Sequence, residues 1–187
     1  MSDQQRVEKF MEMAGKVGAE TMKFADLQSV AGYIASQVSG QTLVPSTFLA
    51  EKHGLARLLS NSGVDVFKGD FRGADHVPAA GVTFSNFALA DTGTIVLEST
   101  AEDIRLATTL PEKHFILVDP VTILKDNLAA AAPMNVFHNG SDPVFVAYIT
   151  GPSRTADIER VLTIGCHGPR ELHILLVDGI SDDMMEN

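Results

Sequence analysis

Three short, continuous apolar runs constrain the fold of this chain most strongly. They cover residues 115–118, 144–149 and 172–177, and each has the length of an ordinary strand. A strand without polar alternation is typically buried on both faces, as in a parallel sheet covered by other layers. Because helical patterns alternate with these runs, we predict an α/β domain with a largely parallel sheet and at least one hairpin.

Apolar residues at helical spacing predict the helices of this domain. We expect amphipathic helices over 3–24, from the cap Asp26 to Gly40, from the cap Ser46 to about Leu59, over 122–132 before Pro133, and over 157–162. Short strands are expected at 43–44, at 64–67, and in a hairpin that joins 82–89 to 95–97. The remaining segments, 68–80, 98–110 and 134–143, are predicted as loop, with 105–110 extended or irregular and a brief helix possible within 68–80.

The length of 187 residues and a hydrophobic content of 45% suit one domain with one substantial core. We expect a helical segment over 1–40 packed on an α/β domain over 41–180, followed by an acidic, frayed tail over 181–187. No apolar run approaches the roughly 20 residues that a membrane-spanning helix needs. The sequence therefore predicts no membrane span.

A formal net charge of −10 argues against binding to nucleic acids or anionic membranes, which both require a basic surface. Arginines in glycine-rich turns could still hold a small anion. Cys166 is the single cysteine, so no intramolecular disulfide can form, and charged residues interrupt the amino-terminal 3–23. We expect a cytoplasmic protein.

The turn after 144–149 has the ingredients of an anion site. Gly151 permits close backbone approach, Ser153 and Thr155 carry hydroxyls, and Arg154 could bind a carboxylate or phosphate. In the alternative interpretation, Ser153 or Thr155 caps a helix and Arg154 pairs with Asp157 or Glu159. The turn has neither the Walker A nor the GxGxxG pattern of a nucleotide site.

A second glycine-rich turn, 165–171, brings Cys166, His167, Arg170 and Glu171 together. His167 beside an arginine and a glutamate could act in acid/base chemistry or bind a carboxylate, although a structural or solvated histidine is the alternative. Cys166 is interpreted as a small buried residue and not as a nucleophile. The histidines, Cys166 and the acidic residues show no metal-binding spacing, so no metal is expected.

Three segments in order, 81–97, 151–159 and 165–173, resemble the LutC/YkgG proteins of the lactate utilisation (LUD) family. The resemblance implies a three-layer α/β fold similar to the NagB/RpiA and CoA-transferase-like group. It also implies a cytoplasmic role in oxidising L-lactate to pyruvate, beside cysteine-rich LutA-like and iron–sulfur LutB-like subunits. With one cysteine this chain cannot supply cluster ligands, so iron–sulfur clusters are expected only in the partner subunits, and a homo-oligomer remains possible.

The three turns are predicted to line one pocket for a small anionic ligand at strand ends, where open α/β sheets bind ligands. The expected ligand-binding residues are Asp91, Thr92 and Thr94 on one wall, Ser153, Arg154, Thr155 and Asp157 at the anion, and His167, Arg170 and Glu171 opposite. Two other functions stay open: a non-catalytic scaffolding subunit, and an isomerase or transferase that acts on an anionic substrate.

Overall fold

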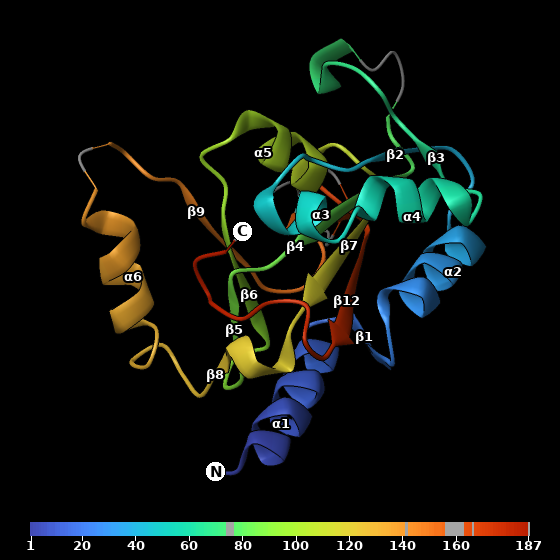
Figure 1. Ribbon diagram of the computed structural model, residues 1–187. Helices are drawn as coiled ribbons and strands as arrows, with labels where there is room; N and C mark the ends of the chain where they lie inside the picture. Colours follow the sequence, from blue (N-terminus) through green and yellow to red (C-terminus); the bar gives the residue numbers. More distant parts are fainter. Residues whose placement is uncertain (74–76, 141, 156–162, 166, 187) are drawn as a thin grey trace.

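A six-stranded parallel sheet forms the centre of the computed structural model, which describes residues 1–73, 77–140, 142–155, 163–165 and 167–186. Its order is β1-β12-β7-β4-β2-β3 (Figure 1). The strands are β1 (Glu20–Phe24), β2 (Gln41–Leu43), β3 (Asp65–Val66), β4 (Ala80–Phe84), β7 (Lys113–Val118) and β12 (Glu171–Val177). All five neighbouring pairs run parallel, which confirms the predicted α/β class and parallel sheet.

Helices cover one face of this sheet. They are α2 (Leu27–Gln37), α3 (Phe48–Lys52) and α4 (Leu55–Asn61). Ile34 and Leu59 from these helices pack in one buried cluster with Phe115 and Leu117 of β7. The neighbouring residues Ile116 and Val118 belong to a second cluster on the opposite face, so β7 is buried on both sides.

The opposite face carries α1 (Asp3–Lys16), α5 (Glu102–Thr109) and a smaller sheet of order β8-β5-β6-β9 (Figure 1). Its strands are β5 (Phe87–Leu89), β6 (Thr94–Glu98), β8 (Ile123–Leu124) and β9 (Val146–Ile149). Phe10 of α1 and Ile95 of β6 pack with Ile116 in the second cluster. The remaining elements are η1 (Phe71–Gly73), η2 (Pro120–Thr122), α6 (Ala131–His138), β10 (Arg154–Thr155) and β11 (Thr163–Ile164).

The first predicted helix, 3–24, is wrong in its second half. α1 ends at Lys16, and Gly18 adopts a positive φ of 88° just beyond it. Glycine in this conformation is a common helix stop. The chain then enters β1, which pairs in parallel with β12 at the edge of the central sheet.

Two further helix assignments differ from the prediction. α5 replaces the extended segment expected at 105–110, because Ile104 and Ala107 turn one face of a helix toward the core. The helix expected over 122–132 is instead η2 and β8, and α6 begins at Ala131. Pro133 lies in the first turn of α6, where a missing backbone N–H removes no helical hydrogen bond.

The predicted hairpin is confirmed through its turn, since β5 and β6 pair in antiparallel fashion on either side of residues 90–93. Its first strand, however, divides at Ser85 and Asn86, so β4 lies in the central sheet and β5 in the smaller one. β9 was expected to be buried but is the edge of the smaller sheet, with Tyr148 46% exposed. In the described part of the chain, no helix is long and apolar enough to cross a membrane.

The tail that was predicted to fray over 181–187 begins with an anchored residue. Ser181 and the preceding Ile180 are buried. The buried Asp119, which follows β7, accepts hydrogen bonds from the N–H groups of Ile180 and Ser181 at 2.8 and 3.1 Å. The Asp119 carboxylate accepts a third hydrogen bond from the N–H of Val121 at 3.0 Å. Asp119 therefore anchors residues 180–181 at the carboxyl end of the central sheet.

A substitution at Gly81 can test the contact between β4 and α5. A Cβ at this position would lie 1.8 Å from the carbonyl oxygen of Ala107. We expect Gly81→Ala to lower the free energy of unfolding by about 2 kcal/mol or more, because a rigid backbone atom must move. Gly15→Ala is the control, since nothing lies within 4 Å of its Cβ and the change should stabilise α1 by about 0.5–1 kcal/mol. Urea unfolding of both variants measures the difference, and equal effects would refute the contact.

A substitution at Asp119 can test whether its carboxylate anchors residues 180–181. Asp119→Ala leaves three backbone N–H groups without their acceptor, so we expect a loss of about 3 kcal/mol in unfolding free energy. The exposed Asp65, changed to Ala, should alter stability by less than about 0.5 kcal/mol. If the two variants unfold at the same urea concentration, Asp119 does not hold the segment.

Candidate functional site

The last turn of α1 brings two of the predicted turns together. A Cβ on Gly93 would lie 2.2 Å from the backbone nitrogen of Ala14, and one on Gly151 would lie 2.3 Å from the carbonyl oxygen of Val17. Both glycines also have a positive φ, a conformation that residues with a side chain rarely adopt. Any other residue at position 93 or 151 would therefore clash with the helix end and strain the backbone. The 90–94 and 150–153 turns are therefore held against the same helix end.

Hydroxyl groups link these two turns. Thr94 Oγ1 lies 2.9 Å from Thr150 Oγ1 and donates to Thr92 Oγ1 at 2.7 Å. Asp91 lies in the same hairpin turn, and its Oδ1 is buried without a hydrogen-bond partner among the described residues. The predicted group Asp91, Thr92 and Thr94 is thus in contact with the Thr150 turn through the threonines.

The 150–153 turn also contacts the 165–170 turn. The Ser153 N–H donates to the Pro169 carbonyl at 2.9 Å, and the Gly165 N–H donates to the Ser153 carbonyl at 3.0 Å. β10 and β11 extend this contact as a short antiparallel ladder, in which Thr155 pairs with Thr163. All three predicted turns therefore lie near one another, although far apart in sequence.

A cavity of about 270 Å³ lies between the two glycine-rich turns. Its polar walls include Thr108 of α5, Thr150, Ser153 and His167. A neighbouring hollow of about 510 Å³ is lined by Glu112 and Arg170 and shares Thr109, His167 and Gly168 with the cavity. We call the two together the amino-edge groove, because they lie beside the first residues of β7 and β12.

The position of this groove corrects one expectation. The site was predicted where α/β sheets usually bind ligands, which is outside the carboxyl ends of parallel strands. Leu172 and His114, which line the cavity, are instead the second residues of their strands. The groove therefore lies at the amino ends of the central sheet.

His114 is a groove residue that the sequence analysis missed. It is 1% exposed, yet it lines the cavity, and its Nε2 lies 2.8 Å from Thr83 Oγ1. Burial lowers the pKa of His114 to about 3, so its ring is neutral at physiological pH. The sequence does hold a signal for this residue, because His114 directly precedes the apolar run 115–118. A histidine buried at the start of such a strand needs a polar partner.

Arg154 and Glu171 take different positions from those predicted. Arg154 is exposed, and its Nη2 donates to the Val17 carbonyl at 2.5 Å, at the end of α1. Glu171 accepts from Lys113 Nζ at 2.9 Å and pairs with His173 at 3.0 Å. The hydrogen bond from Lys113 is the main cause of a lowered pKa at Glu171. Neither residue lines the groove.

The Glu171 pair belongs to a network on the α2 face of the sheet. The buried His173 ring stacks on Phe115, with centroids 4.6 Å apart, and its Nδ1 lies 3.0 Å from the Tyr33 hydroxyl. Burial raises the pKa of Tyr33. His173 is thus a core residue with polar partners.

The structure therefore brings Ser153, His167 and Arg170 to one groove and places the Thr94 hydroxyl next to it. Arg170 is exposed and forms no ion pair with a described residue. Asp157 and Cys166 lie outside the described residues. Within the described ranges, no group of three or more His, Cys, Asp or Glu side chains is arranged to hold a metal ion.

Comparisons with known proteins place these features in a family. The family model of the LUD domain matches residues 7–177. Lactate utilization protein C of Bacillus licheniformis is 32% identical over 151 residues, which cover 74% of this chain and 63% of that protein. Lactate utilization protein C of Bacillus subtilis is 32% identical over 150 residues, covering 74% and 62%. This chain therefore matches somewhat less than two thirds of the length of these two relatives.

A solved structure supports the fold independently. The crystal structure of a DUF162 family protein from Deinococcus radiodurans superimposes with a TM-score of 0.64 at 20% identity, over 95% of this chain and 99% of that one. At this identity the likeness concerns the fold alone. Since the family model spans both sheets and all three turns of the groove region, the chain belongs to the LUD domain family.

Proposed function

We propose that this chain is a component of an L-lactate oxidation system and binds a small carboxylic acid, lactate or its product pyruvate, in the amino-edge groove. The observation that carries the proposal is the neutral, buried His114 in the wall of the cavity. The Nε2 of this ring is held by Thr83 Oγ1 at 2.8 Å, which leaves the Nδ1, without a hydrogen-bond partner among the described residues, available to a ligand in the cavity. The named relatives supply the choice of acid.

The groove has uncharged hydrogen-bonding groups in its cavity and one arginine in the neighbouring hollow, which suits a small hydroxy or oxo acid. His114 and Ser153 offer uncharged hydrogen-bonding groups to a 2-hydroxyl or 2-oxo group. Arg170, in the neighbouring hollow, offers a guanidinium to the carboxylate. Glu112 lies in the same hollow and disfavours a more highly charged anion there.

Oxidation of lactate removes two electrons, and the proposed system needs a carrier for them. One cysteine cannot ligate an iron–sulfur cluster, so we assign the carrier to LutA-like and LutB-like partner subunits in the cytoplasm. In this system the chain would bind the carboxylic acid, and the partner subunits would carry the electrons. The rival role, a scaffolding subunit without ligand chemistry, predicts partner binding but no affinity for either acid.

Calorimetric titration of lactate and pyruvate tests the groove. We expect saturable binding of at least one acid, weakened about tenfold in Arg170→Gln, because a charge-assisted hydrogen bond contributes about 1.5–3 kcal/mol. Arg57→Gln removes another exposed arginine away from the groove and should leave binding unchanged. Arg154→Ala should destabilise the chain through Val17 without a comparable effect on affinity. Folded protein that binds neither acid would support the scaffolding role instead.

His114 predicts a pH dependence of stability. Its folded pKa of about 3 lies below the ordinary value of 6.5, so the unfolded chain binds more protons between these values. Stability is therefore complete above pH 6.5 and falls as the pH decreases toward 3. We expect wild type to lose up to about 1.4 kcal/mol per pH unit more than His114→Gln, which does not titrate. Urea unfolding at several pH values between 7 and 4 measures both slopes, and identical slopes would show that His114 is not buried in its neutral form.

A further inference from the structure

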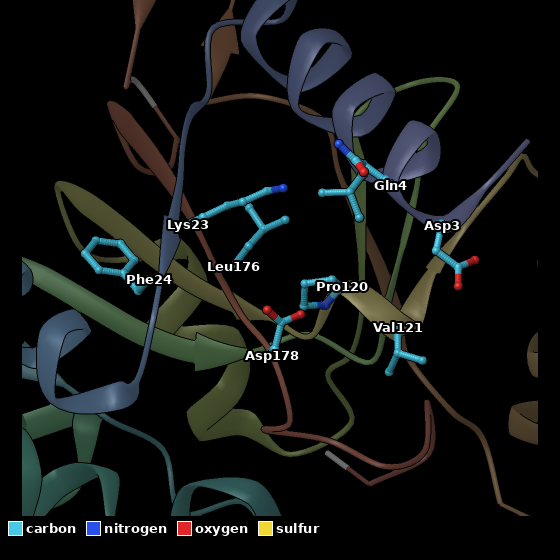
Figure 2. Close-up of a pocket in the computed structure, with 9 residues that line it drawn as sticks. Asp3, Gln4, Lys23, Phe24, Pro120, Val121, Leu176 and Asp178 are labelled. Carbon is cyan, nitrogen blue, oxygen red and sulfur yellow. The ribbon is translucent and has the colours of Figure 1, made fainter.

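A second hollow, separate from the groove, lies at the opposite end of the central sheet. It has a volume of about 320 Å³ and is bounded by the ends of β1 and β12, by η2, which follows β7, and by the start of α1. Figure 2 shows Lys23 extending from β1, Asp178 just past β12, and Leu176 between them in this view. Val7, Leu176 and Pro120 give it an apolar floor.

The topology makes this a favoured place for a ligand. The chain leaves β1 for α2 on one face of the sheet, and it leaves β7 for β8 on the other. Since β12 lies between these two strands, the connections diverge around its carboxyl end. Ligands of open α/β sheets bind at such divergences, outside the carboxyl ends of the strands.

Two opposite charges in the hollow have no described partner. Asp3 pairs with Arg6 at 2.9 Å, and Gln4 donates to Glu8 at 2.9 Å, so these two lining residues are engaged. Lys23 and Asp178 form no ion pair with each other or with another described residue. Lys23 of β1 pairs with Leu176 of β12 in the parallel register, so the two side chains lie on the same face of the sheet. The methylene groups of Lys23 therefore lie next to the apolar floor of the hollow.

We propose that this hollow binds a small zwitterion, an α-amino acid with an apolar side chain. Its carboxylate would meet Lys23 and the positive end of the 14-residue helix α1, and its ammonium would meet Asp178. Its side chain would contact Val7, Leu176 and Pro120. A simple anion would be repelled by Asp178 and a simple cation by Lys23, so the pair of charges selects a molecule that carries both signs.

Three probes of the same shape test this selection. L-leucine carries both charges, L-leucinamide lacks the carboxylate, and 4-methylpentanoate lacks the ammonium. We expect saturable binding of leucine by calorimetry, and about tenfold weaker binding of each analogue. Equal binding of all three would overturn the proposal, because the apolar floor alone would then account for it, and the absence of leucine binding to the folded chain would overturn it as well.

Variants locate the binding. Lys23→Gln and Asp178→Asn change exposed residues, so the fold should persist, and each should weaken leucine binding about tenfold. Lys9→Gln and Asp65→Asn remove the same charges from exposed sites away from the hollow and should have no effect. Unchanged affinity in both hollow variants would place leucine elsewhere and refute the site. None of these four residues lines the amino-edge groove, so this result is independent of lactate binding.

Discussion

The burial of β7 on both faces is the constraint on which the rest of the structure depends. Its side chains alternate between two apolar clusters, with Phe115 and Leu117 on one side and Ile116 and Val118 on the other. Each cluster needs a covering layer, and these layers are α2, α3 and α4 on one face and α1, α5 and the smaller sheet on the other. The hydrophobic effect therefore specifies three layers before any polar contact is considered.

The same alternation separates the polar residues at the start of the strands. His114 points with Ile116 into the face that carries the groove, whereas Glu171 and His173 lie with Phe115 on the α2 face. Neighbouring residues of one strand therefore face opposite sides of the central sheet. This explains why Glu171, predicted as a wall of the site beside Arg170, is engaged with Lys113 instead.

Local patterns in the sequence predicted the class of fold, the hairpin turn, and the proximity of this turn to the two glycine-rich turns. They failed where tertiary contacts decide. The segment 20–24 continues a helical pattern but becomes a strand because β12 offers it a parallel partner. β9 is as apolar as a buried strand, yet it lies at an edge. Sequence spacing placed Ser153, His167 and Arg170 in one predicted pocket, and the structure brings them to one groove. Spacing could not show that Arg154 turns toward α1, or that His114 reaches the cavity from another strand.

The bond between Arg154 and the Val17 carbonyl joins the groove region to the amino-terminal helix. Val17 also adjoins Gly151, so the helix end and the turn share one small contact area. A ligand that recruited Arg154 would first have to detach it from α1, and its affinity would fall by the free energy of that contact. By thermodynamic reciprocity, bound ligand would weaken the docking of α1 by the same amount. The helix end and such a ligand are in this sense competitors for a single guanidinium.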